Sequence, residues 1–339
     1  MLRVLGVLLA VLFAIAAAVL TWPVFFRVDQ MFPLAQAISF RPLIVAGFAV
    51  TALVFLLFAL ARPLRGFALS IAAIALVAAG IGAATLVSRG LGTTELPAET
   101  ETSVRVMTWN TAGEATDPAA VAQTAVAMSA DIISLPETTI ETGEAIAIAM
   151  RELGSPMWAH HVEFGVDSWD ARSTTLLITP ELGDYSVIAS SQDGTSNTAV
   201  LPSAVAMPID GEGPIVVAVH AVAPREEYMD QWRDDLRWLA DQCVDEDVIM
   251  AGDFNATIDH MQRLGVDGGT LGHCRDAAAD SGNGALGTWS TRVPALLGAP
   301  IDHVMYSSHW QVTGSIVLKS MDDSGSDHRP LVAQLEPVD

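Results

Sequence analysis

The chain has 339 residues, of which 51% are hydrophobic, and its formal net charge is −22. The charge is divided unevenly: residues 1–89 hold six arginines and one acidic residue and sum to +5, whereas residues 90–339 hold 11 basic and 38 acidic residues and sum to −27. This contrast excludes one uniform domain and indicates two modules. It also counts against a second module that binds nucleic acid through its phosphates, because such binding needs basic side chains.

The first module, residues 1–89, is predicted to lie in a membrane. Three segments of 17, 19 and 23 residues contain no charged residue: 4–20, 43–61 and 66–88. A helix that spans a bilayer needs about 20 apolar residues. The first segment is the shortest and is also compatible with a signal peptide, because Arg3 precedes its apolar stretch. A buried helical hairpin of a soluble protein is the alternative, but all three segments are apolar on every side.

The positions of the arginines predict how these segments are oriented. Basic residues near membrane spans favour the cytoplasmic side, which applies to Arg3 and to Arg62 and Arg65 between the last two segments. Two arginines in the first connection oppose this bias. Three spans that begin inside place the second module outside, and cleavage of the first segment gives the same result. We therefore expect a multi-pass cell-membrane protein whose second module is extracytoplasmic.

The second module begins with a polar segment, 90–103, that is predicted to be a linker, and continues as one α/β domain over 104–339. Short apolar runs alternate there with helical stretches at 118–130 and 225–244. The predicted strands are 104–110, 131–137, 173–179, 214–220, 248–255, 302–308 and 330–336. Such alternation is typical of helices packed on a sheet.

The chain has two cysteines, Cys243 and Cys274, and both lie in the second module. An oxidising exterior would permit a disulfide between them. Two separate buried thiols fit the sequence equally well, so the pairing stays open here. The cysteines do not have the spacing to cysteine or histidine that is typical of a zinc site.

Polar side chains lie at the ends of several predicted strands. They are carboxylates, carboxamides and histidines: Asn110, Glu137, His220, Asp253, Asn255, Asp302, Asp327 and His328. Asp253 and Asn255 are two positions apart and would share one face of an extended chain, with Phe254 on the other. Each residue alone could form a turn or belong to the core, but strand ends in layered sheets meet at one rim, where sites form. We expect the whole set to converge.

The chemistry of this set predicts hydrolysis of a phosphate ester. Oxygen ligands suit a hard cation such as Mg²⁺, which needs one or two carboxylates and keeps several waters. A carboxylate can take a proton from water, and histidines can supply positive charge and hydrogen bonds to phosphate oxygens. Together they indicate metal-assisted attack of water on phosphorus, with Mg²⁺ or Mn²⁺ as the ion.

Five short motifs make the hypothesis more specific. In chain order they are TWN (108–110), PE (136–137), GDFN (252–255), IDH (301–303) and SDH (326–328). Their order and approximate spacing resemble the endonuclease/exonuclease/phosphatase superfamily, which includes deoxyribonuclease I-like proteins, over roughly 104–339. The resemblance implies a four-layer α/β/β/α sandwich of two mixed sheets, preceded here by the transmembrane helices.

The resemblance implies a metal side to the site. Glu137 would be the principal Mg²⁺ ligand, with Asn110 beside it and Asp327 contributing to the metal region. Two positions depart from patterns in the superfamily: Pro136 stands where many relatives have glutamine, and Ala112 where apurinic endonucleases have aspartate. The second departure weakens the case for a DNA-repair enzyme.

The resemblance also implies a phosphate side. Asp253 would orient or deprotonate the attacking water, and Asn255 would hold a phosphate oxygen. His328 would bind the phosphate and stabilise the pentacovalent state, with Asp302 as its carboxylate partner. His220 would be the second histidine on this side.

Charge and the membrane module favour a lipid substrate. Residues 90–339 carry −27 and a single lysine, Lys319, which disfavours duplex nucleic acid as a partner. A tethered site meets the head groups of the lipid bilayer at high local concentration. We expect a phosphate-containing lipid, either a phospholipid or a polyprenyl (pyro)phosphate of the cell envelope. The alternatives are an exported metal-dependent nuclease and a non-catalytic binding module.

One long segment, 284–303, lies just before Asp302 and contains Trp289 and Arg292. It is rich in glycine and proline and apolar in places. We interpret it as a loop on the substrate side, since functional residues favour such loops. A plain connection is the alternative.

Overall fold

The computed structural model describes residues 2–93, 95–165, 170–188, 197–244 and 246–338. The chain divides into two compact units, Met1–Ser88 and Arg89–Asp339. Each unit has an apolar core of its own.

Helices make up the first unit: α1 (Leu2–Thr21), α2 (Leu34–Ile38), α3 (Arg41–Phe58) and α4 (Arg65–Arg89), whose last residue belongs to the second unit. In length and composition, α1, α3 and α4 could each cross a membrane, and at most 33% of any of these spans is buried. They pack around Phe48 and small residues such as Ala52 and Ala75. Alanines at the contacts let the helix backbones approach closely. The three apolar segments of the sequence are therefore three long helices with apolar outer faces.

Two six-stranded sheets form the centre of the second unit. Sheet A has the order β11 (Trp310–Val317), β12 (Leu331–Pro337), β1 (Val104–Thr108), β2 (Ile132–Pro136), β4 (Ser173–Ile178) and β3 (Trp158–Glu163). Sheet B has the order β5 (Tyr185–Val187), β6 (Ala204–Pro208), β7 (Ile215–His220), β8 (Val248–Asp253), β10 (Asp302–Tyr306) and β9 (Arg275–Asp276). Both sheets are mixed, because β1–β2 and β7–β8 are parallel and their other pairings are antiparallel.

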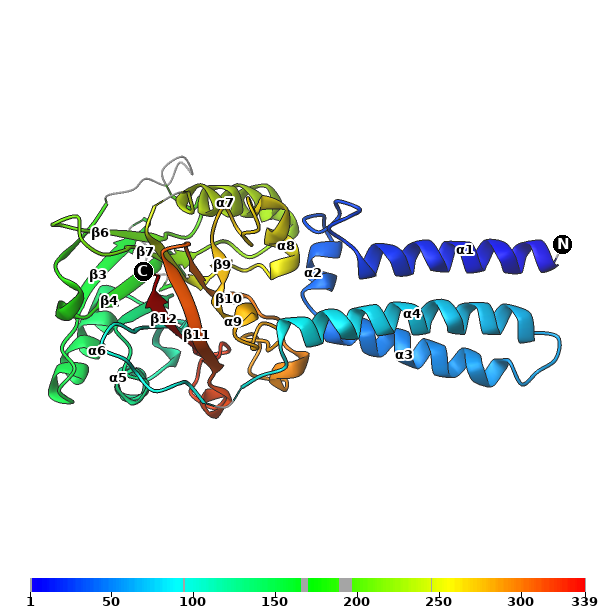
Figure 1. Ribbon diagram of the computed structural model, residues 1–339, viewed down its shortest axis with the longest axis horizontal. Coiled ribbons are helices and arrows are strands. Elements are labelled where there is room, and N and C mark those ends of the chain that lie inside the picture. The colour runs from blue at the N-terminus through cyan, green and yellow to red at the C-terminus, as the bar shows by residue number, and fades with distance from the viewer. Residues whose placement is uncertain (1, 94, 166–169, 189–196, 245, 339) are drawn as a thin grey trace. The chain divides into compact units, whose positions relative to one another are not determined.

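Helices cover the outer faces of the two sheets (Figure 1). α5 (Pro118–Ala127) and α6 (Ile140–Glu152) pack on sheet A over a core that includes Met107, Ile133 and Ile146. On the other side of the sandwich lie α7 (Met229–Gln242) and α8 (Ile258–Met261), whereas α9 (Ala277–Asp280) lies against β10 and β11 and adds Ala277 and Ala278 to the core between the sheets. The four-layer α/β/β/α sandwich implied by the resemblance is confirmed.

The main core lies between the sheets. Val106 and Ile132 of sheet A pack there with Val216 and Ile249 of sheet B, and all four are fully buried. The central strands β2 and β8 are buried along their whole length, because a helix layer covers the face that does not meet the other sheet. β8 ends in Asp253, and Glu137 directly follows β2.

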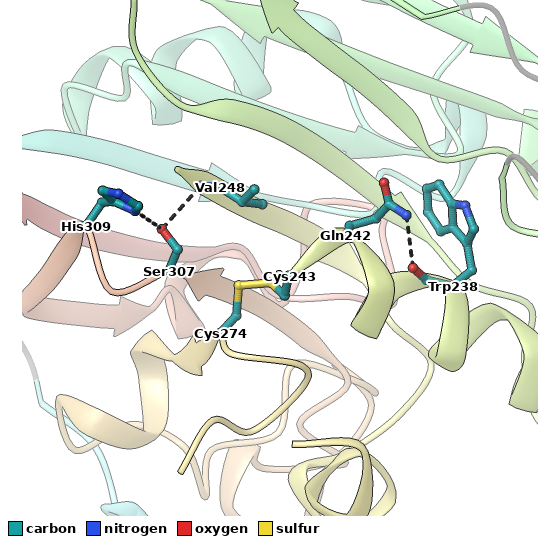
Figure 2. The surroundings of a disulfide bond; sticks show 7 residues. All are labelled: Trp238, Gln242, Cys243, Val248, Cys274, Ser307 and His309. Atoms are coloured by element: carbon teal, nitrogen blue, oxygen red, sulfur yellow. Dashed lines mark hydrogen bonds between the residues drawn. A yellow bond between two sulfur atoms is a disulfide. The ribbon is translucent and has the colours of Figure 1, made fainter. Parts of the chain in front are cut away.

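A disulfide joins Cys243, at the C-terminal end of α7, to Cys274, just before β9 (Figure 2). The two Cα atoms are 5.5 Å apart, within the normal range for this bond. The pairing that the sequence left open is therefore present. The bond ties α7 to the edge of sheet B.

The segment 90–103, which the sequence suggests is a linker, belongs to the second unit and is bound along its surface. Thr93 donates its backbone N–H to Asn283 Oδ1 at 2.9 Å. Further along, Gln334 Nε2 donates to Ala98 O at 3.1 Å, and Thr100 Oγ1 donates to Glu336 Oε1 at 2.8 Å. The ordered domain thus begins directly at Arg89.

Candidate active site

Three candidate residues lie side by side at the ends of neighbouring strands of sheet B. Asp253 is the last residue of β8, and its partners across the ladders are His220, the last residue of β7, and Asp302, the first residue of β10. The parallel β7–β8 pair and the antiparallel β8–β10 pair together bring these three residues into one row. All three are at most 2% exposed, so their polar groups are almost completely shielded from solvent.

Gly252 explains why a glycine precedes Asp253 in the GDFN motif. Its φ is +153°, and a Cβ at this position would lie 2.0 Å from the carbonyl oxygen of Val219. No other residue fits without moving β8 away from β7. The glycine therefore sets the close approach that places Asp253 next to His220.

Sheet A contributes Asn110 and Glu137, which follow β1 and β2. Asn110 Nδ2 donates to Glu137 Oε1 at 3.0 Å and to Asp253 Oδ2 at 3.2 Å, so one carboxamide links both sheets. His220 Nε2 lies 3.8 Å from Glu137 Oε1. Glu137 has φ +57°, a left-handed conformation that non-glycine residues adopt rarely and mostly at functional sites.

His328 stands opposite Asp253. Its Nδ1 lies 2.8 Å from Asp302 Oδ2, which fixes the orientation of the ring. The other nitrogen, Nε2, lies 3.8 Å from Asp253 Oδ2 and 3.9 Å from Asp327 Oδ1. Asp327 is the most open of these groups, since its side chain is 44% exposed.

Asn255 is drawn back toward Asp253. Its backbone N–H donates to Asp253 Oδ1 at 2.8 Å, and its Nδ2 donates to Ala221 O at 2.9 Å and to Asp253 Oδ2 at 3.3 Å. The residue has φ +46°, a conformation that asparagine tolerates better than most. Asp253 thus receives hydrogen bonds from Asn110 and Asn255 on two sides. All eight candidate residues named from the sequence meet in this one place.

A family comparison agrees with this geometry. The model of the Endonuclease/Exonuclease/phosphatase family matches residues 107–328, which is more than half of the chain. The chain belongs to the endonuclease/exonuclease/phosphatase family. No curated protein matches it significantly.

Solved structures show the fold of this family. An endonuclease/exonuclease/phosphatase from Beutenbergia cavernae is 18% identical with a TM-score of 0.54, over 70% of this chain and 72% of that one. One from Bacteroides vulgatus is 18% identical with a TM-score of 0.50, over 70% and 100%. A humanized D. rerio TDP2 is 14% identical with a TM-score of 0.52, over 69% and 99%.

Electrostatics separates the ionisable groups of this endonuclease/exonuclease/phosphatase site. Burial and then the neighbouring Asp302 raise the pKa of Asp253 to about 7, although His328 opposes them. Burial alone would lower the pKa of His328, but Asp302 and Asp253 stabilise its protonated ring and raise that pKa to about 10. Burial, followed by repulsion from His328, lowers the pKa of His220 to about 3. At neutral pH His328 is therefore charged and His220 is neutral, so only one of the two histidines supplies positive charge.

The oxygen-rich donor set fits a hard divalent cation. Within the described residues, ligand atoms of Asp253, Asp302 and His328 lie within 4.8 Å of one another. Asp302 Oδ1 is buried there without a hydrogen-bond partner in the described part of the chain. The raised pKa of His328 keeps protons on both ring nitrogens, so the carboxylates are the better ligands. Glu137 adds a carboxylate that is 29% exposed, which leaves room for the waters that Mg²⁺ retains.

Asn110 and Asp327 were expected on the metal side, and the geometry gives each a specific contact. Asn110 Oδ1 accepts the backbone N–H of Ala112 at 3.0 Å, so its amide group orients Glu137. Asp327 Oδ2 accepts the indole N–H of Trp289 at 2.8 Å, at the open edge of the site.

Three supporting residues were missed from the sequence. Ser326 Oγ donates to Asn110 O at 2.6 Å and accepts from His328 N at 2.9 Å, so it bridges the two sides. Trp109 Nε1 donates to His328 O at 3.1 Å, and Thr288 Oγ1 accepts from Asp302 N at 3.1 Å. Ser326 and Trp109 lie inside the SDH and TWN motifs, so the sequence could have indicated that they belong to the site. Thr288 lies in the segment 284–303, which the sequence suggested as a substrate-side loop, but no motif marks this residue itself.

Proposed function

We propose that this protein is a membrane-tethered, Mg²⁺-dependent phosphoesterase that hydrolyses a lipid-linked phosphate or phosphodiester, either a phospholipid or a polyprenyl pyrophosphate, at the cell envelope. One observation carries the catalytic part: Asn110 bonds both Glu137 and Asp253, and the His328–Asp302 pair stands across from Asp253. Groups that suit a metal ion, a water and a phosphate are thus held around one point.

Each side chain has a separate role in the proposed reaction. When bound, the Mg²⁺ neutralises charge on the phosphoryl oxygens. Ionised Asp253, fixed by Asn110 and Asn255, takes the proton of the attacking water as the water oxygen bonds to phosphorus. The ester or anhydride bond to the leaving group breaks, and the leaving oxygen takes a proton from solvent. Protonated His328, held by Asp302, donates from Nε2 to a phosphoryl oxygen whose negative charge grows. Neutral His220 is limited to hydrogen bonding.

The lipid part of the proposal is supported by the helices and the charge. α1, α3 and α4 are long and apolar enough to cross a membrane. The second unit carries a strong negative charge and a single lysine, Lys319, so it would repel a polyanion such as duplex DNA. A tethered enzyme needs no net attraction, because its lipid substrate is already concentrated beside it.

The disulfide between Cys243 and Cys274 supports an extracytoplasmic position for the catalytic unit. Such bonds form and persist in oxidising compartments and are rare in the cytosol. Alkylation of intact cells with a membrane-permeant thiol reagent, before and after reduction, tests this. A mass shift only after reduction supports the exterior, whereas immediate labelling of both cysteines contradicts it.

The substrate class is tested with the full chain in nanodiscs. Polyprenyl pyrophosphate, phosphatidylglycerol, plasmid DNA and a soluble p-nitrophenyl phosphodiester are each offered with Mg²⁺ and with EDTA. We expect EDTA-sensitive turnover of a lipid phosphate and little DNA cleavage. DNA cleavage without lipid turnover would instead establish an exported nuclease, and no turnover at all would favour a non-catalytic binding module.

A further inference from the structure

A loop beside the site, residues 284–299, exposes apolar side chains that the hydrolytic reaction does not require. Trp289 donates to Asp327 at 2.8 Å and forms a β-bridge with His328, so this loop is one wall of the site. The segment that the sequence suggested as a substrate-side loop therefore touches two of the candidate residues.

The loop is held rigidly by Arg329, which is fully buried. Its guanidinium donates to Gly287 O at 3.1 Å, Ser290 O at 3.2 Å and Val293 O at 2.7 Å. The same group pairs with both carboxylate oxygens of Asp322, at 2.6 and 2.9 Å. A buried arginine with this many partners fixes the path of the backbone it binds.

Despite this rigidity, the loop exposes large apolar side chains. Val293 is 37% exposed, and Leu296 and Leu297, in the 3-10 turn Ala295–Leu297, are 48% and 38% exposed. Arg329 binds the carbonyls of Gly287, Ser290 and Val293, so the backbone that leads into this turn is fixed. Clustered apolar exposure on a fixed loop is typical of an interaction surface.

The base of the loop is bound to the chain where it leaves α4. Gly284 N donates to Arg89 O at 2.8 Å, and Ala285 N donates to Gly90 O at 3.1 Å. Arg89 also pairs with Asp259 in a bidentate contact, at 2.7 and 2.9 Å. A Cβ on Gly90 would lie 2.0 Å from the backbone of Gly282, so glycine is required for this close contact. The next residue, Leu91, is 50% exposed.

We propose that Leu296 and Leu297, together with Leu91, enter the interfacial layer of the phospholipid bilayer that holds α4. The proposal rests on the proposed function, because it assumes that α4 spans that bilayer. Arg89, the last residue of α4, and Gly90 bond the base of the loop, and Gly287 N donates to Ala295 O at 2.7 Å, so the turn that carries the leucines is joined to that base. The loop would then lead from the lipid surface to Asp327 and His328, so that a lipid phosphate reaches the site without leaving the membrane.

Labelling tests the contact without any measurement of activity. The native cysteines are joined in a disulfide, so Leu297→Cys can be labelled alone with the fluorophore NBD in the full chain. Nanodiscs of phosphatidylcholine and phosphatidylglycerol that contain a nitroxide lipid should quench it at least twofold more than NBD at Ile148→Cys, an exposed apolar position on α6. Equal quenching at the two positions overturns the proposal.

Measurements of activity test whether the membrane contact helps a lipid substrate to reach the site. The double variant Leu296→Ser/Leu297→Ser should lose at least about tenfold in kcat/KM on polyprenyl pyrophosphate or phosphatidylglycerol in nanodiscs, because two apolar anchors are removed. Turnover of the soluble p-nitrophenyl phosphodiester should stay within about twofold. The matched control is Ile148→Ser/Leu153→Ser: Ile148 is 49% exposed on α6, and Leu153 is 50% exposed at the C-cap of that helix.

The two proposals fail in different ways. Equal losses on lipid and soluble substrates would mean that the leucines support the site itself, and this overturns the membrane contact. If the wild-type chain hydrolyses neither substrate, the proposed function is wrong, while strong quenching at position 297 would still establish the membrane contact.

Discussion

The two halves of the candidate site are built differently. Sheet B contributes His220, Asp253 and Asp302 from within regular strands, and all three are almost completely buried. Sheet A contributes Asn110 and Glu137 from beyond its strand ends, where Glu137 is 29% exposed and has a positive φ. A dry and rigid half suits proton transfer between groups with shifted pKa values, whereas an open half suits an ion that keeps its waters. The structure therefore predicts that damage to each half will have a different signature.

Loss of the base in the buried half should have the largest effect. Asp253→Asn keeps the shape and the burial but removes the carboxylate that takes the proton, so kcat should fall by about 10²–10³-fold. Because metal binding does not depend on that carboxylate alone, added Mg²⁺ should not restore the rate. Steady-state kinetics with Asp241→Asn, an exposed aspartate near the end of α7, as the matched control tests this. A rate within fivefold of wild type would remove Asp253 from the chemistry.

Loss of the carboxylate in the open half should be smaller and partly reversible. Glu137→Gln leaves one oxygen for the ion and keeps a partner for Asn110, so activity should fall by about 10–100-fold at limiting Mg²⁺. Titration with Mg²⁺ or Mn²⁺ should recover much of it, and calorimetry should show weaker metal binding. If the variant binds the metal as wild type does, the metal ligands lie elsewhere, with the Asp253–Asp302–His328 group as the next candidate.

The dependence of kcat/KM on pH should be set by the ionisable groups of the buried half alone. Below about pH 7 Asp253 is protonated and cannot accept a proton, so kcat/KM should rise with pH up to that value and fall again as His328 deprotonates near pH 10. Asp302 raises the pKa of both groups, so Asp302→Asn should move both limbs to lower pH and lower the maximum by about tenfold. Glu137→Gln should leave the limbs in place. A profile that Asp302→Asn does not move would contradict the assignment.

The sequence was sufficient for the parts of the fold in which buried runs end in functional groups. β1, β2, β4, β7, β8 and β10 all lie within predicted strands, and β12 extends one residue beyond its predicted end. The strands that were not predicted, β3, β5, β6, β9 and β11, include the outer strands of both sheets. β3 is intermediate or exposed at every position, and β5 and β9 have three and two residues, so neither periodicity nor length distinguishes them from loops.

Within the site, the sequence predicted which residues lie close together but not the protonation state or the hydrogen-bond partners of each. That His220 is neutral follows from complete burial next to a charged His328, and neither condition can be derived from the letters around it. Similarly, Asn110 turns its amide nitrogen toward two carboxylates because the N–H of Ala112 takes its oxygen. The groups that Asn110 and His220 contact, Glu137 and Asp253 for the first and His328 for the second, are far away in the chain, so these roles become visible only in three dimensions.

The smallest effect is expected at the rim, where the two halves meet the loop 284–299. Trp289→Phe keeps the ring but removes the N–H that holds Asp327, whose side chain is 44% exposed and can find water instead. We expect a loss in kcat of about two- to fivefold, with the pH limbs unchanged, because Asp327 is the last and weakest of the groups that raise the pKa of His328. Parallel pH–rate profiles of Trp289→Phe and Asp302→Asn measure this directly. A shift as large as that of Asp302→Asn would make the rim part of the buried half, and the distinction between a dry half and an open half would then fail.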